Sequence, residues 1–424
     1  MQKAINYFHV EGTPVECKVF GHGHINYTYK ITTDTGHEYI LQRINKNVFK
    51  DPESLMENVS AVSEFLRKRV SDPRSALHFI PADGGKFYHK DSRGEYWRVY
   101  EFVGGFCLEA AETPEDFYES AIAFGHFQEM LRDFPAEKLH ETIPEFHNTV
   151  NRYVLFEDAL EQDMCNRAKS VEQEIGFIMA RKGEAGLLQR MREAGELPLR
   201  VTHNDTKLNN VLLDSDTRKA LCVLDLDTVM PGLSLYDYGD SIRFGASTAA
   251  EDEPDLGKVG IDLDLYRTYT EGYMRACPSM TEAEIRMLPW GARIITLELG
   301  VRFLTDYLEG DQYFKTAYPE HNLVRARTQL RLVADMEDKW DEMEAIVREV
   351  AQSLQHVVAV ALCVRNGRLR SYPQTSVDAC AEVFGKLSVD FLVDFLRGIV
   401  CANAHGGILG TCREGHHGAH GDSQ

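Results

Sequence analysis

The sequence predicts an α+β fold of two lobes, β-rich in the N-terminal lobe and mostly helical in the C-terminal lobe. Two observations predict this fold. The first hundred residues read as short strands around one helix, whereas apolar residues from Thr113 onward recur mainly at helical spacing. We expect an N-terminal lobe over residues 1–103, a C-terminal lobe over residues 104–350 and a tail of unclear structure over residues 351–424.

The N-terminal lobe is expected to hold five strands, at residues 18–20, 26–32, 38–44, 86–89 and 96–102. The second and third strands form a hairpin beside a glycine-rich loop, Gly-His-Gly-His at residues 21–24. One helix starts after Asp51, since Pro52 is favourable in a first helical turn. Its apolar residues recur at helical spacing, at Leu55, Val59, Val62 and Leu66.

The C-terminal lobe is expected to begin with a capped helix at the Thr-Pro-Glu sequence of residues 113–115. An apolar stripe then follows at Phe117, Ala121, Phe124 and Phe127. Further helices are expected from Leu263 and from Arg293, continuing to about residue 350. Residues 199–229 interrupt this pattern, because two short apolar runs there surround clusters of Asn and Asp.

Composition excludes several classes of partner. The chain has 46 Lys and Arg against 66 Asp and Glu, a formal net charge of −20, so most of its surface would repel a nucleic-acid backbone. No run of about eighteen apolar residues occurs, and the first ten residues lack a secretory signal pattern. Nine cysteines without a framework spacing are typical of reduced thiols. We expect a cytoplasmic protein that acts on a small molecule, with neither nucleic acid nor membrane as partner; the oligomeric state stays open.

Residues 199–229 carry polar side chains at the spacing of a phosphoryl-transfer site. Such a site needs a carboxylate near the acceptor hydroxyl, cations around the phosphates and oxygen ligands for Mg²⁺. The order His-x-Asp-x-Lys-x-x-Asn begins at His203. We predict that Asp205 accepts the hydroxyl proton and that Lys207 offsets charge on the phosphoryl group. Asn210, and Asp225 on the following strand, would hold Mg²⁺, with ATP as the donor.

Three further residues are expected to shape this loop. His203 would hold the loop in shape rather than take part in the chemistry. Asp240 would brace the loop, and Asp227 would be either a second metal contact or a loop-fixing carboxylate. A lone Asn- and Asp-rich turn usually only caps and turns the chain, but the full spaced set followed by Leu-Asp-Leu-Asp favours function.

These residues resemble the catalytic loop and metal segment of the aminoglycoside-phosphotransferase and choline-kinase family, whose members are relatives of the protein kinases. Residues 203–210, 224–232 and 238–243 resemble most closely its N-acetylhexosamine 1-kinase branch, and the resemblance extends over about residues 5–350. It implies a bilobal, protein-kinase-like fold with ATP and Mg²⁺ as cofactors. It also implies that the acceptor is the anomeric hydroxyl of N-acetylglucosamine or N-acetylgalactosamine.

The resemblance places the nucleotide against the N-terminal lobe. A kinase-like fold expects a cation on the third strand, where relatives often carry Lys; this chain has Gln42 and Arg43 there, and Arg43 has the charge. Glu57 on the next helix is its expected partner, although an exposed Arg43 and a solvated Glu57 are the plainer interpretation. The other ATP-binding residues are expected in the glycine-rich loop and the hinge, at Gly21, Gly23, Asn26, Glu101 and Val103.

The resemblance also implies that the acceptor, besides meeting Asp205, contacts His24, Phe244, Arg302 and Tyr313. Without the resemblance, Tyr313 reads as a surface aromatic residue. Arg302 then reads as half of a salt bridge with Asp306, four residues further on.

Several alternatives stay open. Another small alcohol, such as homoserine, choline or an aminoglycoside, is the alternative acceptor, and a non-catalytic nucleotide-binding module is the alternative to an enzyme. A protein kinase is disfavoured, because Leu226 and Asp227 follow the metal aspartate in place of Phe and Gly. In the tail, a repeated Cys-x-x-x-His spacing would suit zinc, although a poorly ordered terminus explains it as well; it comprises Cys401, His405, Cys412 and His416.

Overall fold

The computed structural model describes residues 4–21 and 25–365, the last nine of them by backbone alone. The chain divides into two compact units, Met1–Leu354 and Gln355–Gln424. Both predicted lobes lie in the first unit, and the boundary between residues 103 and 104 stays a prediction. The zinc spacing at residues 401–416 and most of the predicted tail lie outside the described residues.

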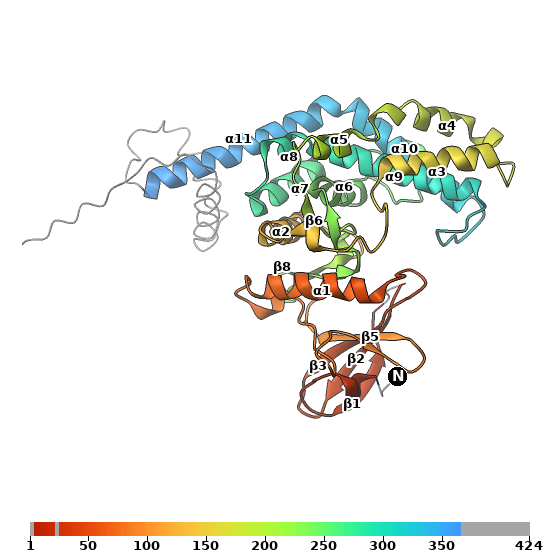
Figure 1. Cartoon of the computed structure of the whole chain (residues 1–424). Coiled ribbons are helices and arrows are strands. Elements are labelled where there is room, and N and C mark those ends of the chain that lie inside the picture. Colours follow the sequence, from red (N-terminus) through yellow and green to blue (C-terminus); the bar gives the residue numbers. More distant parts are fainter. Residues whose placement is uncertain (1–3, 22–24, 366–424) are drawn as a thin grey trace, which may run out of the picture. The chain divides into compact units, whose positions relative to one another are not determined.

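The N-terminal part is an antiparallel sheet in the order β1-β2-β3-β5-β4 (Figure 1). Its strands are β1 (Pro14–Val19), β2 (Tyr27–Thr33), β3 (Glu38–Arg43), β4 (His89–Lys90) and β5 (Tyr96–Glu101). Gly36 has a φ of +83° in the turn between β2 and β3, which a glycine adopts without steric cost. The strand predicted at residues 86–89 is wrong in its extent, because only His89 and Lys90 pair with β5.

Helix α1 (Pro52–Arg67) lies between this sheet and the helical part of the chain (Figure 1). The carboxylate of Asp51 accepts hydrogen bonds from the backbone N–H groups of Glu53 and Ser54 and so caps the helix. The buried face of α1 includes Leu55 and Val62, and it shares one hydrophobic cluster with residues of the helical part, among them Phe127, Val201 and Leu212. Helix α1 thus joins the two predicted lobes through apolar contact.

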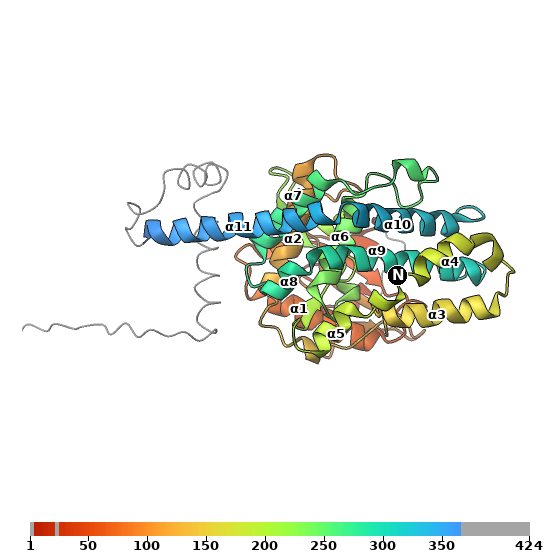
Figure 2. The ribbon, with the colours of Figure 1, turned by 90° about the horizontal axis from the view of Figure 1, so that it is seen from above.

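The rest of the described chain is mostly helical (Figures 1 and 2). Its helices are α2 (Pro114–Met130), α3 (Thr149–Gln162), α4 (Glu172–Met179), α5 (Leu187–Glu193), α6 (Ser234–Gly245), α7 (Leu263–Ala276), α8 (Glu282–Arg286), α9 (Leu288–Leu308), α10 (His321–Asp338) and α11 (Trp340–Arg365). Two predicted bounds are corrected. Helix α9 begins at Leu288 rather than at Arg293, because Pro289 is tolerated in its first turn, and α11 continues past residue 350.

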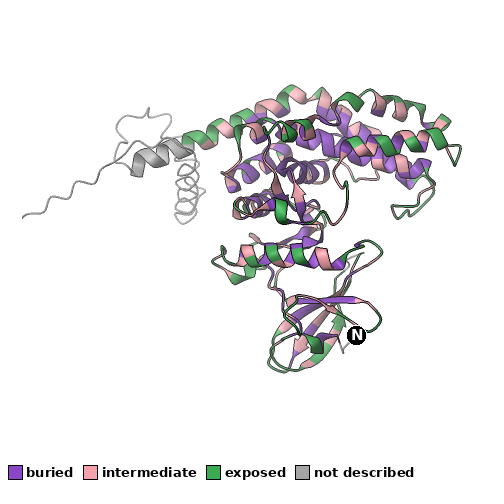
Figure 3. Cartoon of the chain, viewed as in Figure 1, coloured by how far each residue is buried: buried purple, intermediate pink, exposed green. Residues whose placement is uncertain are grey.

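Helix α9 is buried along almost its whole length (Figure 3). It crosses α6 at two glycines: a Cβ atom on Gly239 would stand 2.3 Å from the carbonyl oxygen of Gly291. Only glycine at this crossing lets the two backbones approach so closely. Helix α6, which carries residues of the candidate site, is therefore fixed against the centre of the helical core.

Two small antiparallel pairs of strands lie at the edge of the helical part: β6 (Arg200–Thr202) with β9 (Met230–Gly232), and β7 (Val211–Leu213) with β8 (Ala220–Val223). They hold the two polar segments, residues 203–210 and 224–229, side by side. The predicted α+β fold, β-rich first and mostly helical afterwards, is confirmed. Over the described residues, no helix combines the length and apolar character needed to cross a membrane.

Candidate active site

The loop between β6 and β7 brings the predicted catalytic residues together. One carboxylate oxygen of Asp205 lies 2.9 Å from Nζ of Lys207, and the other accepts a 3.0 Å hydrogen bond from the Asn210 amide. The same amide donates to the Asp205 carbonyl at 2.8 Å. The side chains of Asp205 and Lys207 stay 31% and 38% exposed. This carboxylate is therefore oriented from both sides and still accessible to a substrate.

The backbone of this loop is held by Asp237 on α6. Its carboxylate, 1% exposed, accepts hydrogen bonds of 2.8 Å from the N–H groups of His203 and Asn204 and from the Gln128 side chain. Burial raises the pKa of Asp237, although these donors oppose the change. Nε2 of His203 lies 2.8 Å from the Leu224 carbonyl oxygen. This contact ties the loop to residues 224–229, which carry Asp225 and are called the metal segment below.

Asp225 and Asn210 supply oxygen atoms suited to a divalent cation. Burial, and then Asp227, raise the pKa of Asp225 to about 7, and a cation bound beside the carboxylate would lower that pKa again. The side-chain carbonyl of Asn210 has no donor within the described chain, and its backbone carbonyl accepts from the Leu224 N–H at 2.8 Å. Nowhere in residues 4–21 and 25–365 do three or more His, Cys, Asp or Glu side chains gather to hold a metal. Asp225 and Asn210 alone would fit a Mg²⁺ ion whose remaining ligands are waters and nucleotide phosphates.

Asp227 connects the metal segment to the N-terminal sheet. One of its oxygens forms an ion pair with Nη1 of Arg98 on β5, and the other accepts a 2.6 Å hydrogen bond from the amide of Asn26. Nε of Arg98 donates to the side-chain oxygen of Gln42 on β3 at 2.9 Å. Both oxygens of Asp227 are therefore occupied by protein donors, which favours its role as a loop-fixing carboxylate.

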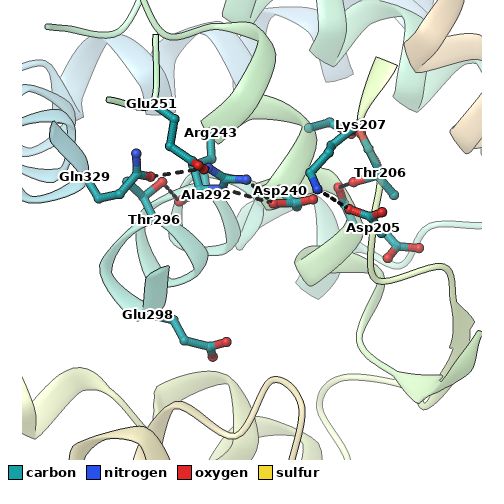
Figure 4. A network of polar contacts seen from close by, with 12 residues as sticks. Asp205, Thr206, Lys207, Asp240, Arg243, Glu251, Ala292, Thr296, Glu298 and Gln329 are labelled. Atoms are coloured by element: carbon teal, nitrogen blue, oxygen red, sulfur yellow. Dashed lines mark hydrogen bonds and ion pairs between the residues drawn. The ribbon is translucent and has the colours of Figure 1, made fainter. Parts of the chain in front are cut away.

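Charges of alternating sign continue from Asp205 into the helical core (Figure 4). Burial alone would lower the pKa of Lys207, but Asp205 and then Asp240 outweigh it and raise that pKa. Asp240 pairs with Arg243 at 2.9 Å, and Arg243 pairs with Glu251 at 2.7 Å. Asp240 thus forms its ion pair with Arg243 and acts on Lys207 through space, whereas the hydrogen bonds that brace the loop backbone go to Asp237.

The predicted adenine contacts lie at the end of β5. The N–H of Glu101 donates to the His78 carbonyl at 2.9 Å, and its side chain lies 2.9 Å from Nδ1 of His78. The backbone of Val103 has no hydrogen bond to another described residue, and its contact with ATP stays a prediction. Gly21 has a φ of +75°, whereas Gly23 and His24 lie outside the described residues.

Arg43 and Glu57 do not contact each other in the structure. The guanidinium of Arg43 lies 4.0 Å from the ring centroid of Tyr27 and 4.0 Å from the Glu95 carboxylate. Glu57 is 67% exposed and lies 2.7 Å from Nε2 of His140. Both side chains thus have partners that the sequence did not predict, and their roles at the nucleotide stay predictions.

The predicted acceptor residues fall into two groups. Arg302 lies 5.9 Å from the ring centroid of Tyr313 and 5.5 Å from that of Phe314, whereas Phe244 lines a separate cavity of about 790 Å³. That cavity reaches Thr206, next to Asp205. The alternative salt bridge between Arg302 and Asp306 is wrong, because Asp306 accepts hydrogen bonds from the backbone of the following loop, at Gln312, Tyr313 and Phe314.

Residues 16–271, more than half of the chain, match the model of the phosphotransferase enzyme family. The chain belongs to this family. Similar solved structures include a microcompartment-associated aminopropanol kinase, with 18% identity, a TM-score of 0.51 and coverage of 81% of this chain and 97% of that one. An aminoglycoside phosphotransferase from Alicyclobacillus acidocaldarius shares 14% identity (TM-score 0.53; 84% and 96% covered), as does a choline kinase from Cryptosporidium parvum (0.51; 82% and 96%). These likenesses confirm the protein-kinase-like fold.

Sequence reasoning about this phosphotransferase missed Arg98 as a site residue and did not predict that Asp237 holds the loop. Arg98 stands within an ordinary alternating strand, and its partner Asp227 is 129 residues away, so no local pattern marks it. Asp237 gave a weak signal, since an Asp inside a helix that follows a catalytic motif needs a partner when buried. Pairing β3 with β5 in register would have placed Arg98 opposite Gln42.

Proposed function

We propose that this protein transfers the γ-phosphoryl group of ATP to a hydroxyl of a small molecule, with Asp205 as the base. The observation that carries the proposal is the Asp205 carboxylate, held between Lys207 and Asn210 beside Asp225. A carboxylate, a cation and two oxygen ligands on adjoining loops are the parts that phosphoryl transfer requires.

Asp205 would orient the acceptor hydroxyl and take its proton as the new bond from oxygen to phosphorus forms. The bond between the γ-phosphorus and the ADP oxygen breaks, and ADP leaves with that electron pair. Lys207, paired with Asp205 and influenced through space by Asp240, would offset charge on the transferred group. Asn210 and Asp225 would hold Mg²⁺, which when bound neutralises charge on the phosphate oxygens.

We further propose that the acceptor is the anomeric hydroxyl of N-acetylglucosamine or N-acetylgalactosamine, giving the sugar 1-phosphate. One support is the resemblance of residues 203–210, 224–232 and 238–243 to that branch of kinases. The other is chemical, because an uncharged sugar is bound by hydrogen-bond donors and aromatic side chains. Arg302 supplies donors among the rings of Phe146, Tyr313 and Phe314. Burial and then Arg302 lower the pKa of Arg152, although Glu298 opposes the change, so a second guanidinium lies near Arg302.

Another small alcohol is the second candidate, because solved proteins of this fold include an aminopropanol kinase and a choline kinase. A cationic acceptor such as choline needs an acidic or aromatic cage. The arginines at positions 152 and 302 would oppose such a ligand. The intact set of Asp205, Lys207, Asn210 and Asp225 disfavours a non-catalytic nucleotide-binding module.

We place this activity in the cytoplasm. The cysteines whose side chains the structure describes are free thiols, as a reducing compartment would keep them: Cys17, Cys107, Cys165, Cys222 and Cys277.

The experiment is ATP consumption by the purified protein with Mg²⁺ across a panel of alcohols, with phosphorus NMR of the product. The panel holds N-acetylglucosamine, N-acetylgalactosamine, glucose, galactose, choline, homoserine and kanamycin. Turnover confined to the N-acetyl sugars, with an anomeric phosphate signal, would establish the proposal. Turnover on another alcohol would keep the mechanism and discard the sugar; no turnover with nucleotide still bound would favour the non-catalytic module.

A further inference from the structure

The buried guanidinium of Arg98 is a cation of the N-terminal sheet that lies against the metal segment. It is 3% exposed, and Nη1 is paired with Asp227. Burial alone would lower its pKa, but Asp227, with a smaller contribution from Asp225, outweighs burial and raises it. The guanidinium therefore stays charged beside Asp227, two residues after the Asp225 carboxylate that would hold Mg²⁺.

The sheet register explains why this cation comes from β5. Gln42 on β3 pairs directly with Arg98 on β5, and the two side chains are hydrogen-bonded at 2.9 Å. Gln42 stands on the strand where a kinase-like fold carries its cation, but an amide cannot offset phosphate charge. Arg43 is the next residue, and because side chains alternate along a strand it points to the opposite face, over Tyr27.

Arg98 also has a donor to spare. Nε is used by Gln42 and Nη1 by Asp227, whereas Nη2 has no acceptor within residues 4–21 and 25–365. A guanidinium presents its N–H groups in a planar fork that matches phosphate oxygens. We propose that Arg98 binds the phosphates of the nucleotide in place of a cation on β3, with Gln42 and Asp227 as its positioning residues. This inference rests on the proposed function and adds a residue to its nucleotide site.

Asp227 holds Asn26, the residue before β2, as well as Arg98. Its second oxygen accepts a hydrogen bond from the amide of Asn26, and the Asn26 side-chain oxygen accepts from the Asn45 N–H at 3.0 Å. One buried carboxylate thus orients both the guanidinium of Arg98 and the side chain of Asn26. Changes at Asp227 are expected to act on nucleotide affinity through both.

The test is isothermal titration calorimetry with MgADP and with adenosine, on the full chain. Arg98→Gln is expected to weaken MgADP binding by about 10- to 100-fold, the loss typical of hydrogen bonds to a charged group, and to leave adenosine binding unchanged. Because Arg98→Gln leaves Asp227 buried without its cation, the double variant Arg98→Gln/Asp227→Asn is measured too. It removes both charges and is expected to stay as weak as Arg98→Gln.

Recovery of wild-type MgADP affinity in the double variant would overturn the inference, because Arg98 would then serve only to neutralise Asp227. A loss of MgADP affinity in Arg43→Gln, with no loss in the Arg98 variants, would also overturn the inference, because the phosphate-binding cation would then be on β3. Arg93→Gln, an exposed change in the neighbouring turn, is the matched control. If the wild type binds MgADP but phosphorylates no alcohol, the proposed function fails while the role of Arg98 is still decided; no nucleotide binding at all overturns both.

Discussion

The loop of residues 203–210 holds one ion pair of the candidate site within itself, whereas the N-terminal sheet forms another with a distant segment of the chain, and the two pairs are assembled differently. In the loop, Asp205 and Lys207 are two residues apart, and their contact of 2.9 Å follows from one short turn of chain. In the sheet, Arg98 and Asp227 are 129 residues apart and meet only once β5, β3 and the metal segment are in place. A pair made within a motif can be found by spacing; a pair made by tertiary structure cannot.

The two pairs also differ in solvent access, which matches what each would do. The side chains of Asp205 and Lys207 are 31% and 38% exposed, whereas those of Arg98 and Asp227 are both 3% exposed. A base has to exchange a proton with an incoming substrate. A positioning carboxylate instead gains from burial, which strengthens its hold on a fixed cation at the expense of desolvation.

The largest effect is expected in the loop. Asp205→Asn removes the proton acceptor but keeps the shape of the side chain, so kcat should fall by about 10²- to 10⁴-fold. MgADP affinity should stay near that of the wild type. Single-turnover assays with the best acceptor, together with calorimetry, measure the two quantities.

Asp216→Asn, an exposed change in the turn after β7, is the matched control for that experiment. A well-folded Asp205→Asn protein with near wild-type kcat would show that the loop carboxylate is not the base.

The next effect concerns the residue that braces the loop. Asp237→Ala leaves the N–H groups of His203 and Asn204 and the Gln128 amide without their acceptor. The free energy of unfolding should fall by about 2–4 kcal/mol, since unpaired buried donors are costly. Urea unfolding measures this change, with Asp216→Ala as the control. An unaltered unfolding midpoint would mean that the loop holds its shape without α6.

A smaller effect tests whether the two strands are interchangeable. In the double variant Gln42→Lys/Arg98→Gln, the cation moves from β5 to β3, and MgADP should bind about tenfold more tightly than to Arg98→Gln alone. Calorimetry on the two variants gives the ratio. Equal affinities would show that the position of the guanidinium, and not the presence of a charge on this face, decides binding.

The smallest effect is expected at Glu57. Its side chain is 67% exposed and paired with His140, and exposed pairs contribute little, so Glu57→Gln should change MgADP affinity by less than about twofold. A large loss would instead support the predicted partnership of Glu57 with a cation at the phosphates.

The sequence alone predicts the fold class, which is confirmed, and it brings forward the loop of residues 203–210 and Asp225, whose roles stay predictions; all of these depend on local order. Periodicity marks α1, and the spacing from His203 to Asn210 marks the loop. The sequence does not predict which face of β3 carries Arg43, since a one-residue shift of register reverses the faces. It also does not predict that Asp237 holds the loop while Asp240 pairs with Arg243, because both acids lie on the same helix three residues apart.

The shared carboxylate of Asp227 restricts the order in which substitutions can accumulate at this site. Exchanging a β3 cation for one on β5 takes two changes, at the positions of Gln42 and Arg98, which face each other in register. If the cation on β5 is gained first, two positive side chains lie against the single buried carboxylate of Asp227. If the cation on β3 is lost first, that carboxylate is buried without a partner. Both intermediates are destabilised. Positions 42 and 98 are therefore expected to vary as a pair, so that a relative with Lys at the β3 position carries no Arg opposite it.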